Sequence, residues 1–227
     1  PTTPALANFN FNDVAQGVSN VVFYGGNHLD DTPTTDEVFS NSTFYSSQIV
    51  FKVEGGEVDT YTEKLEKDFD LTFGAPRIVN GSIIVNVPMG FGDALGGGIN
   101  PKTVGVRGQF ILYHVTATGT ETELGDKTTH DYERSIGNNS QAGVMFCEFF
   151  SVTNKKFRVG EKLRLTVKLF GINADDADQN VVWGIGNDPQ NRNDIETGEA
   201  GDAQRYLCMP DDVDTNLIIQ VPFKIDI

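Results

Sequence analysis

The chain of 227 residues carries 17 basic and 32 acidic side chains, which gives a net charge of −15. This length fits one all-β domain, or one domain with an arm. An acidic surface repels nucleic acid and anionic membranes, so we expect neither as a partner. No apolar run approaches the roughly 20 residues that cross a bilayer, so no membrane span is expected. An apolar fraction of 38% excludes wholesale disorder.

The composition favours strands over helices. Val, Ile and Thr together number 56, whereas Ala and Leu number 23. β-branched side chains suit a pleated, half-buried surface, and helices prefer Ala and Leu. With 24 glycines available for sharp turns, the sequence predicts an all-β fold.

Residues 1–65 differ in pattern from the rest, and we expect them to form an N-terminal arm and extension. The segment starts with small polar residues, and Phe9 and Phe11 alternate with asparagines. Phe23 and Tyr24 close a short apolar run. We expect these four aromatic residues to bind partner subunits, with packing on their own domain as the alternative. Deletion of residues 1–12 is then expected to weaken association and to leave the fold intact.

One short helix is predicted, over residues 59–67. Tyr61, Leu65 and Phe69 recur at every fourth position, and a Thr-x-x-Glu capping box precedes Leu65. We find no other helix candidate of this quality in the chain.

From residue 66 to 227 the hydrophobic period is two, as in strands. About eight strands with turn signals between them predict a two-sheet antiparallel sandwich, and a jelly roll is the most natural arrangement. Strand order does not follow from the pattern, so an immunoglobulin-like topology stays open. The predicted core consists of Val85, Val87, Phe110, Leu112, Leu163, Leu165, Val167, Leu169, Leu217, Ile219, Val221 and Phe223.

No catalytic constellation is recognisable in the sequence. It lacks a GxSxG turn and zinc or cysteine hydrolase motifs, so we expect no enzymatic activity, no catalytic residue and no cofactor. His114 is expected to be a hydrogen-bonded structural residue within a strand. Cys147 is expected to be a buried free thiol, with a bridge to Cys208 as the alternative. Glu148, set between apolar neighbours, is the one carboxylate whose position suggests a special role.

Two acidic segments, 175–180 and 211–214, bear on metal binding. The first has acids at alternate positions but lacks the glycine at the sixth position and the glutamate at the twelfth, which excludes an EF-hand. We expect solvated loops and no metal ligands, and a calcium site shared by the two segments is the alternative.

Three stretches in the second half of the chain carry a family resemblance. They are FRVGEKLRLTV at 157–167, GNDPQNR at 186–192 and VPFKIDI at 221–227. The chain from Phe110 onward resembles small jelly-roll structural proteins of bacterial and archaeal viruses. The resemblance implies a virion component, either a capsid subunit or a protein that decorates shell or tail. Its partners would be copies of itself or other virion proteins.

An extracellular carbohydrate-binding or adhesive sandwich, with calcium as an option, is the alternative function. Sugar recognition relies on tyrosine and tryptophan rings. With one Trp and six Tyr, the chain offers a thin platform for it.

Overall fold

The computed structural model describes residues 18–28, 36–46, 49–55, 58–93, 102–137, 140–174, 180–192, 209–210 and 212–224. In these ranges the chain forms twelve strands and no helix. The strands are β1 (Val18–His28), β2 (Asp36–Ser40), β3 (Ile49–Gly55), β4 (Val58–Thr72), β5 (Arg77–Asp93), β6 (Lys102–Val115), β7 (Glu121–Thr128), β8 (Tyr132–Ile136), β9 (Gln141–Phe157), β10 (Lys162–Ala174), β11 (Asn180–Gly186) and β12 (Leu217–Lys224). The predicted all-β class is confirmed.

Strand pairing follows the plan of a long hairpin rolled into a sandwich. The outermost strands β1 and β12 pair with each other, and inside them β4 pairs with β10 and β5 with β9. The innermost strand β6 pairs with β7 and β8, which follow it in the chain. All of these pairs are antiparallel, and this nesting of first with last is the jelly-roll arrangement. β2, β3 and β11 are additions to that plan.

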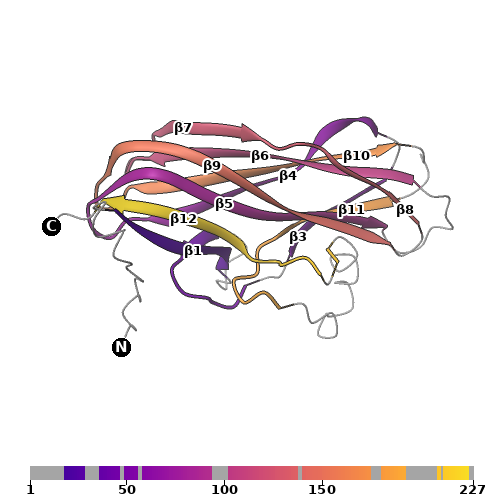
Figure 1. Ribbon diagram of the computed structural model, residues 1–227, viewed down its shortest axis with the longest axis horizontal. Helices are drawn as coiled ribbons and strands as arrows, with labels where there is room; N and C mark the ends of the chain where they lie inside the picture. Colours follow the sequence, from indigo (N-terminus) through magenta and orange to yellow (C-terminus); the bar gives the residue numbers. More distant parts are fainter. Residues whose placement is uncertain are drawn as a thin grey trace.

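Two layers result (Figure 1), and the strand order makes them continuous through β2. The first layer has the order β9-β5-β12-β1, and β11 and β3 extend it beside the far half of β5. The second layer has the order β4-β10-β6, with β7 and β8 on the free edge of β6. β2 joins the layers because it pairs with β1 and makes one parallel bridge to β4, between Val38 and Asp70.

The core fills the space between the two layers. Eleven of the twelve predicted core residues are buried, and the twelfth, Phe223, is partly buried against them. Trp183 on β11 joins this core at 1% exposure and donates its indole N–H to the Gly105 carbonyl of the opposite layer at 3.2 Å. The predicted faces of the strands around Leu165 and Ile219 are therefore confirmed.

The helix predicted over 59–67 is wrong, because this segment belongs to the strand β4. β4 pairs with β10 over most of its length, from Thr72 to Val58. A spacing of four residues is even, so it fits a period of two as well as one of 3.6. Leu65 and Phe69 consequently reach the core from a strand.

Strand pairing begins within the segment expected to be arm and extension. β1 lies between β12 and β2 inside the sheet, and β3 pairs with β11. Residues 18–28, 36–40 and 49–55 of that segment thus belong to the same hydrogen-bonded sheet as the predicted sandwich domain.

Candidate functional sites: an uncharged sheet face and a cationic pocket

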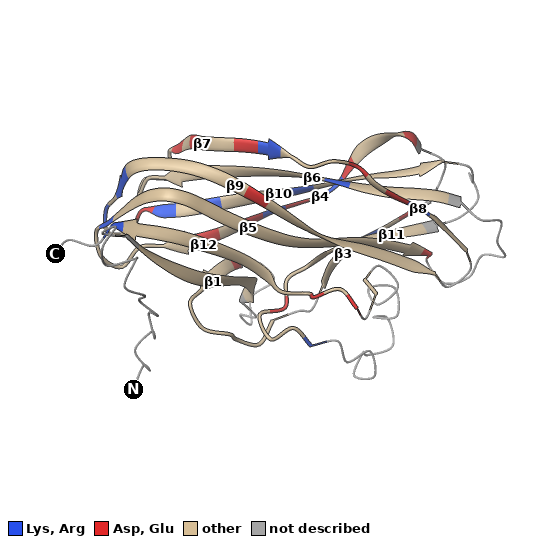
Figure 2. Cartoon of the chain, in the orientation of Figure 1, with Lys and Arg blue, Asp and Glu red and all other residues tan. Residues whose placement is uncertain are grey.

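The outward side of the first layer carries no charge across its middle. Successive side chains of a strand point to opposite faces, and the register aligns the outward ones into rows. Two complete rows are Phe149, Ile84, Gln220 and Val22, and beside them Cys147, Asn86, Ile218 and Tyr24. Figure 2 shows the middle of β1, β5 and β12 free of charged residues. We call these eight residues the uncharged face.

Part of the uncharged face is exposed apolar surface. Phe149 exposes 55% of its surface and Val22 exposes 37%. Ile84, Ile218 and Tyr24 are half-buried between them. Contiguous apolar surface that is open to water marks interaction sites, and depletion of charge is typical of the centre of an interface.

The outward side of the second layer has the opposite character, because it carries several ion pairs within the chain. Arg164 lies 2.7 Å from Asp70 and 2.7 Å from Glu121. Lys168 lies 2.8 Å from Glu66 on β4. The charged groups in these pairs already have partners within the chain and stay in contact with water. The outward side of the second layer is therefore a typical solvent-exposed surface.

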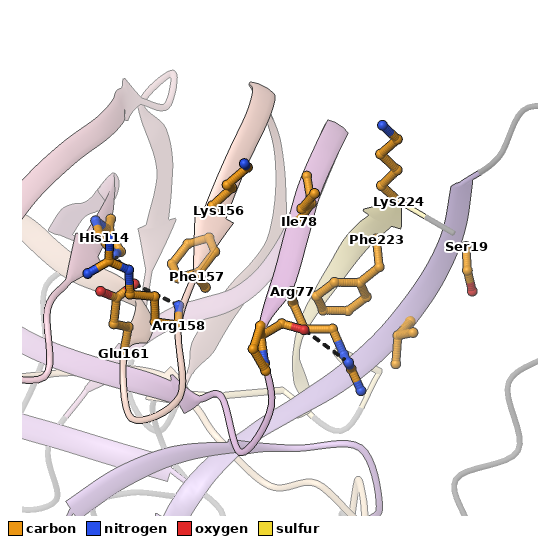
Figure 3. Close-up of a pocket in the computed structure, with 12 residues that line it drawn as sticks. Ser19, Arg77, Ile78, His114, Lys156, Phe157, Arg158, Glu161, Phe223 and Lys224 are labelled. Atoms are coloured by element: carbon orange, nitrogen blue, oxygen red, sulfur yellow. Dashed lines mark hydrogen bonds and ion pairs between the residues drawn. The ribbon is translucent and has the colours of Figure 1, made fainter. Parts of the chain in front are cut away.

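A pocket of about 800 Å³ opens at the end of the sandwich where β5 begins and where β9 and β12 end (Figure 3). Its floor is aromatic. Phe157, Phe223 and the buried Phe73 form one cluster, in which Phe73 lies 4.6 Å from Phe157 and 6.1 Å from Phe223 between ring centroids. Val21 and Ile78 extend the apolar lining. Packed rings of this kind make a rigid, preformed floor.

Four cations are among the residues that line this pocket. Arg77 comes from the start of β5, Lys156 and Arg158 from the end of β9, and Lys224 from the end of β12. All four are exposed, and within the described residues none of them makes an ion pair. Lys156 and Lys224 extend to the same side of the layer (Figure 3). The rim of the pocket is therefore positively charged in a chain that is strongly acidic.

Glu161 is the one acidic residue among the described residues that line the pocket. One of its carboxylate oxygens accepts the Arg158 backbone N–H at 2.8 Å and also lies 2.8 Å from His114 Nε2. The hydrogen bond from the Arg158 backbone, and after it that from His114, lowers the pKa of Glu161 below its usual range. An ionised carboxylate only accepts, so His114 Nε2 carries the proton. The prediction of a hydrogen-bonded structural His114 is confirmed.

The four predicted partner-binding residues fall in different environments. Phe9 and Phe11 lie outside the described residues. Phe23 packs in the core at 9% exposure, with Phe223 edge-on at 6.2 Å, so its ring is engaged inside its own chain instead of being presented to a partner. Tyr24 points outward and belongs to the uncharged face.

The expectation of a buried Cys147 is wrong, since this thiol is free and exposed. Phe146 and Phe150 on the same strand face the core, and alternation turns Cys147 outward. Cys208 lies outside the described residues. Glu148 is half-buried and takes part in no ion pair in the described part of the chain.

Two features bear on the carbohydrate and calcium alternatives. Trp183 is buried and offers no platform for a sugar. Residues 175–179 and 211 lie outside the described ranges, whereas Asp214 is described and accepts a hydrogen bond from Asn191 at 2.8 Å. Among the described residues, no group of three or more His, Cys, Asp or Glu is placed to hold a metal ion. The same residues include no helix long and apolar enough to cross a membrane.

Sequence reasoning missed both sites because each depends on strands that are far apart in the chain. The signal for the uncharged face was nevertheless present. Outward positions of the predicted strands near 84 and 220 are occupied by Asn86, Pro88, Gln220 and Pro222, none of which is charged. Only the strand order makes these positions neighbours of Phe149.

Comparison with known proteins yields matches only to solved structures, because no family and no curated protein match this sequence. A CocE/NonD family hydrolase from Staphylococcus aureus is 7% identical, with a TM-score of 0.43 over 91% of this chain and 37% of the hydrolase. An alpha-amino acid ester hydrolase is 9% identical, with a TM-score of 0.45 over 88% of this chain and 36% of that protein. A structure of infectious bursal disease virus is 8% identical, with a TM-score of 0.27 over 88% of this chain and 40% of the viral chain.

These matches correct the expectation that the protein is not an enzyme. The two matches with the higher TM-scores are hydrolases, so the absence of familiar motifs did not exclude a likeness to enzymes. The chain spans little more than a third of the length of those hydrolases. At TM-scores below 0.5 and identities below 10%, the likeness assigns neither a reaction nor a viral role to this chain.

Proposed function

We propose that the protein is a structural subunit of a virus particle and that it associates with a second copy of itself through the uncharged face. The observation that carries the proposal is the pair of complete rows without a charge in a chain of net charge −15.

Electrostatics favours this face as the place of contact. Two copies repel each other at long range, and burying an ion costs several kcal/mol unless a partner compensates it. Contact through the uncharged face removes no ion from water. It also buries Phe149 and Val22, and each Å² of apolar surface contributes about 25 cal/mol.

The properties of the uncharged face favour a second copy of the chain as the binding partner. In a two-fold dimer the same patch meets its own counterpart, so it has to be compatible with itself. A patch without charge meets that condition, because no like charges are brought together. A strongly cationic partner would instead fit the acidic remainder of the surface.

The assignment to a virus particle draws on the jelly-roll pairing and on the motifs in the second half of the chain. A jelly roll presents broad, flat sheet faces on a rigid core, and viral capsid proteins use this architecture. The stretches at 157–167, 186–192 and 221–227 resemble virion proteins of that architecture. The virion is accordingly the proposed location, and other copies are the proposed partners.

The test places one charge on the proposed interface. Phe149→Glu adds a carboxylate to the uncharged face at a position already exposed to water, so the fold is expected to persist. Thr128→Glu, at an exposed position of β7 in the other layer, is the matched control because it changes the net charge equally. Sedimentation velocity across a concentration series should show association of wild type and of Thr128→Glu, and monomers for Phe149→Glu.

Three outcomes would overturn this proposal. Wild-type protein that stays monomeric at high concentration lacks the proposed contact. Equal association of both glutamate variants places the contact elsewhere. If deletion of residues 1–12 abolishes association and Phe149→Glu leaves it intact, the contact lies in the N-terminal segment with Phe9 and Phe11.

A further inference from the structure

The pocket at the end of β9 and β12 combines a preformed apolar floor with a rim of like charges. Seven lysines and arginines elsewhere in the described residues hold ion pairs with acids of the chain. With 32 acidic side chains in the sequence, acids to pair with cations are abundant. The four cations around this pocket make no ion pair within the described residues, and the same holds for Lys52, Lys127, Arg134 and Lys155. What sets the four apart is that they line one pocket.

Glu161, the acid that lines the pocket among the described residues, is already engaged by other hydrogen-bond donors. Glu161 is buried at 8% exposure, and its carboxylate is engaged by the Arg158 backbone N–H and by His114. These contacts fix the turn between β9 and β10. The Arg158 side chain acts on Glu161 through its charge but makes no ion pair with it within the described residues, so it is able to bind a further anion.

Because the floor of the pocket is apolar, an inorganic anion matches the pocket less well than an anion that carries an apolar group. Phe157 is 1% exposed and supports the floor from beneath, whereas Phe223, Val21 and Ile78 are partly exposed and offer the apolar contact of the pocket. Its volume of about 800 Å³ lies within the range of small-molecule sites, about 300–1,000 Å³. A ligand that matches both parts has an anionic head and an apolar body.

We propose that this pocket binds a small organic anion, in which a carboxylate, sulfate or phosphate group is attached to an aromatic or aliphatic body. The anionic head lies among Arg77, Lys156, Arg158 and Lys224. The apolar body lies on Phe223 and Val21, which Phe157 supports from beneath. The inference is independent of the proposed self-association, because these residues do not belong to the uncharged face.

Isothermal titration calorimetry with naphthalene-2-sulfonate tests the proposal. The neutral naphthalene-2-methanol has a similar body without the charge, and inorganic sulfate has the charge without the body. We expect the aromatic sulfonate to bind at least about tenfold more tightly than either probe, since a charge-assisted hydrogen bond contributes more than the 1.4 kcal/mol of one decade. Raising the salt concentration should weaken its binding.

Variants locate the binding site. Lys156→Gln/Arg158→Gln removes two rim charges from exposed side chains and should weaken binding of the sulfonate by about tenfold or more. Lys127→Gln removes an exposed cation on β7 that makes no ion pair in the described residues, and it should bind like wild type. All titrations are repeated with Phe149→Glu present, so that the result does not depend on the oligomeric state.

Each contrary result has a definite meaning. If the neutral probe binds as tightly as the sulfonate, the rim charges do not select the ligand. If Lys127→Gln weakens binding as much as the double variant, the effect is one of net charge and the pocket is not the site. Tight binding of inorganic sulfate alone would show that the apolar floor plays no part. Any of these results overturns the proposal.

Discussion

At the scale of single residues, Asp70 organises the hydrated face of the second layer. Its carboxylate receives hydrogen bonds from Arg164 Nε at 2.7 Å and from Lys162 Nζ at 2.7 Å. Burial by itself raises the pKa of Asp70, but the hydrogen bonds from Arg164 and Lys162 outweigh it and hold the pKa below its usual range. The folded state therefore favours the ionised form more than the unfolded chain does.

The contribution of Asp70 to stability should depend on pH. A carboxyl with a lowered pKa stabilises the fold above its unfolded value of about 3.9, and this stabilisation is lost as the pH falls through the folded value. We expect Asp70→Asn to lower the free energy of unfolding by about 1–3 kcal/mol at pH 7. Urea denaturation of wild type and Asp70→Asn at pH 7 and again near pH 2 measures this difference in the free energy of unfolding. An equal difference at both pH values would contradict the role of the charge.

Residues of one strand should differ sharply according to the face they occupy. Leu165 is fully buried between the layers, whereas Lys168 lies on the outer face with Glu63 and Glu66. We expect Leu165→Ala to cost about 2–5 kcal/mol, because it leaves a cavity. Lys168→Ala should cost about 1 kcal/mol or less, as exposed ion pairs contribute little. Thermal denaturation compares the two, and similar losses would mean that the faces of β10 are assigned wrongly.

At the scale of elements, the alternation of inward and outward side chains follows from the sequence, whereas the order of the strands in the sheet does not. The core faces of β10 and β12 follow from period two, because each inward residue packs on the opposite layer. Residues 59–67 of β4 are predicted as a helix because, over so short a segment, a spacing of four residues fits both the helical and the strand period. The strand conformation of β4 is decided by pairing with β10, about a hundred residues later in the chain. Such long-range pairing leaves no local trace.

Contact between β10 and β11 makes Gly171 a sensitive position. A Cβ atom at Gly171 would lie closer to the Trp183 indole N–H group than real Cβ atoms approach their neighbours. Trp183 is 1% exposed and is held by its hydrogen bond to the Gly105 carbonyl. We expect Gly171→Ala to destabilise the protein by about 1–3 kcal/mol, as overpacking does.

Gly74 provides the control for this substitution. A Cβ atom there meets no other atom within 4 Å, so Gly74→Ala should change the melting temperature little. A melting temperature of Gly171→Ala equal to that of Gly74→Ala would show that Trp183 can shift at no cost.

At the scale of the whole molecule, charge is distributed by face and not by segment. The sequence predicts the net charge of −15, but not where the charges lie. Several ion pairs lie on the outward side of the second layer, four cations line the pocket at one end, and the uncharged face lies on the outward side of the first layer. The rows of the uncharged face combine residues from 22 to 220, so only the folded topology brings them together.

This distribution predicts opposite salt dependences for the two sites. Between 0.1 M and 1 M salt the Debye length falls from about 10 Å to about 3 Å. Self-association through the uncharged face should become several-fold tighter, because salt screens the repulsion between the acidic copies while burial of Phe149 and Val22 is retained. Binding of naphthalene-2-sulfonate should become weaker, because salt screens its attraction to the cationic rim. Sedimentation equilibrium and calorimetry over one salt series measure both. Association that weakens with salt would mean that ion pairs, and not the uncharged face, hold the copies together.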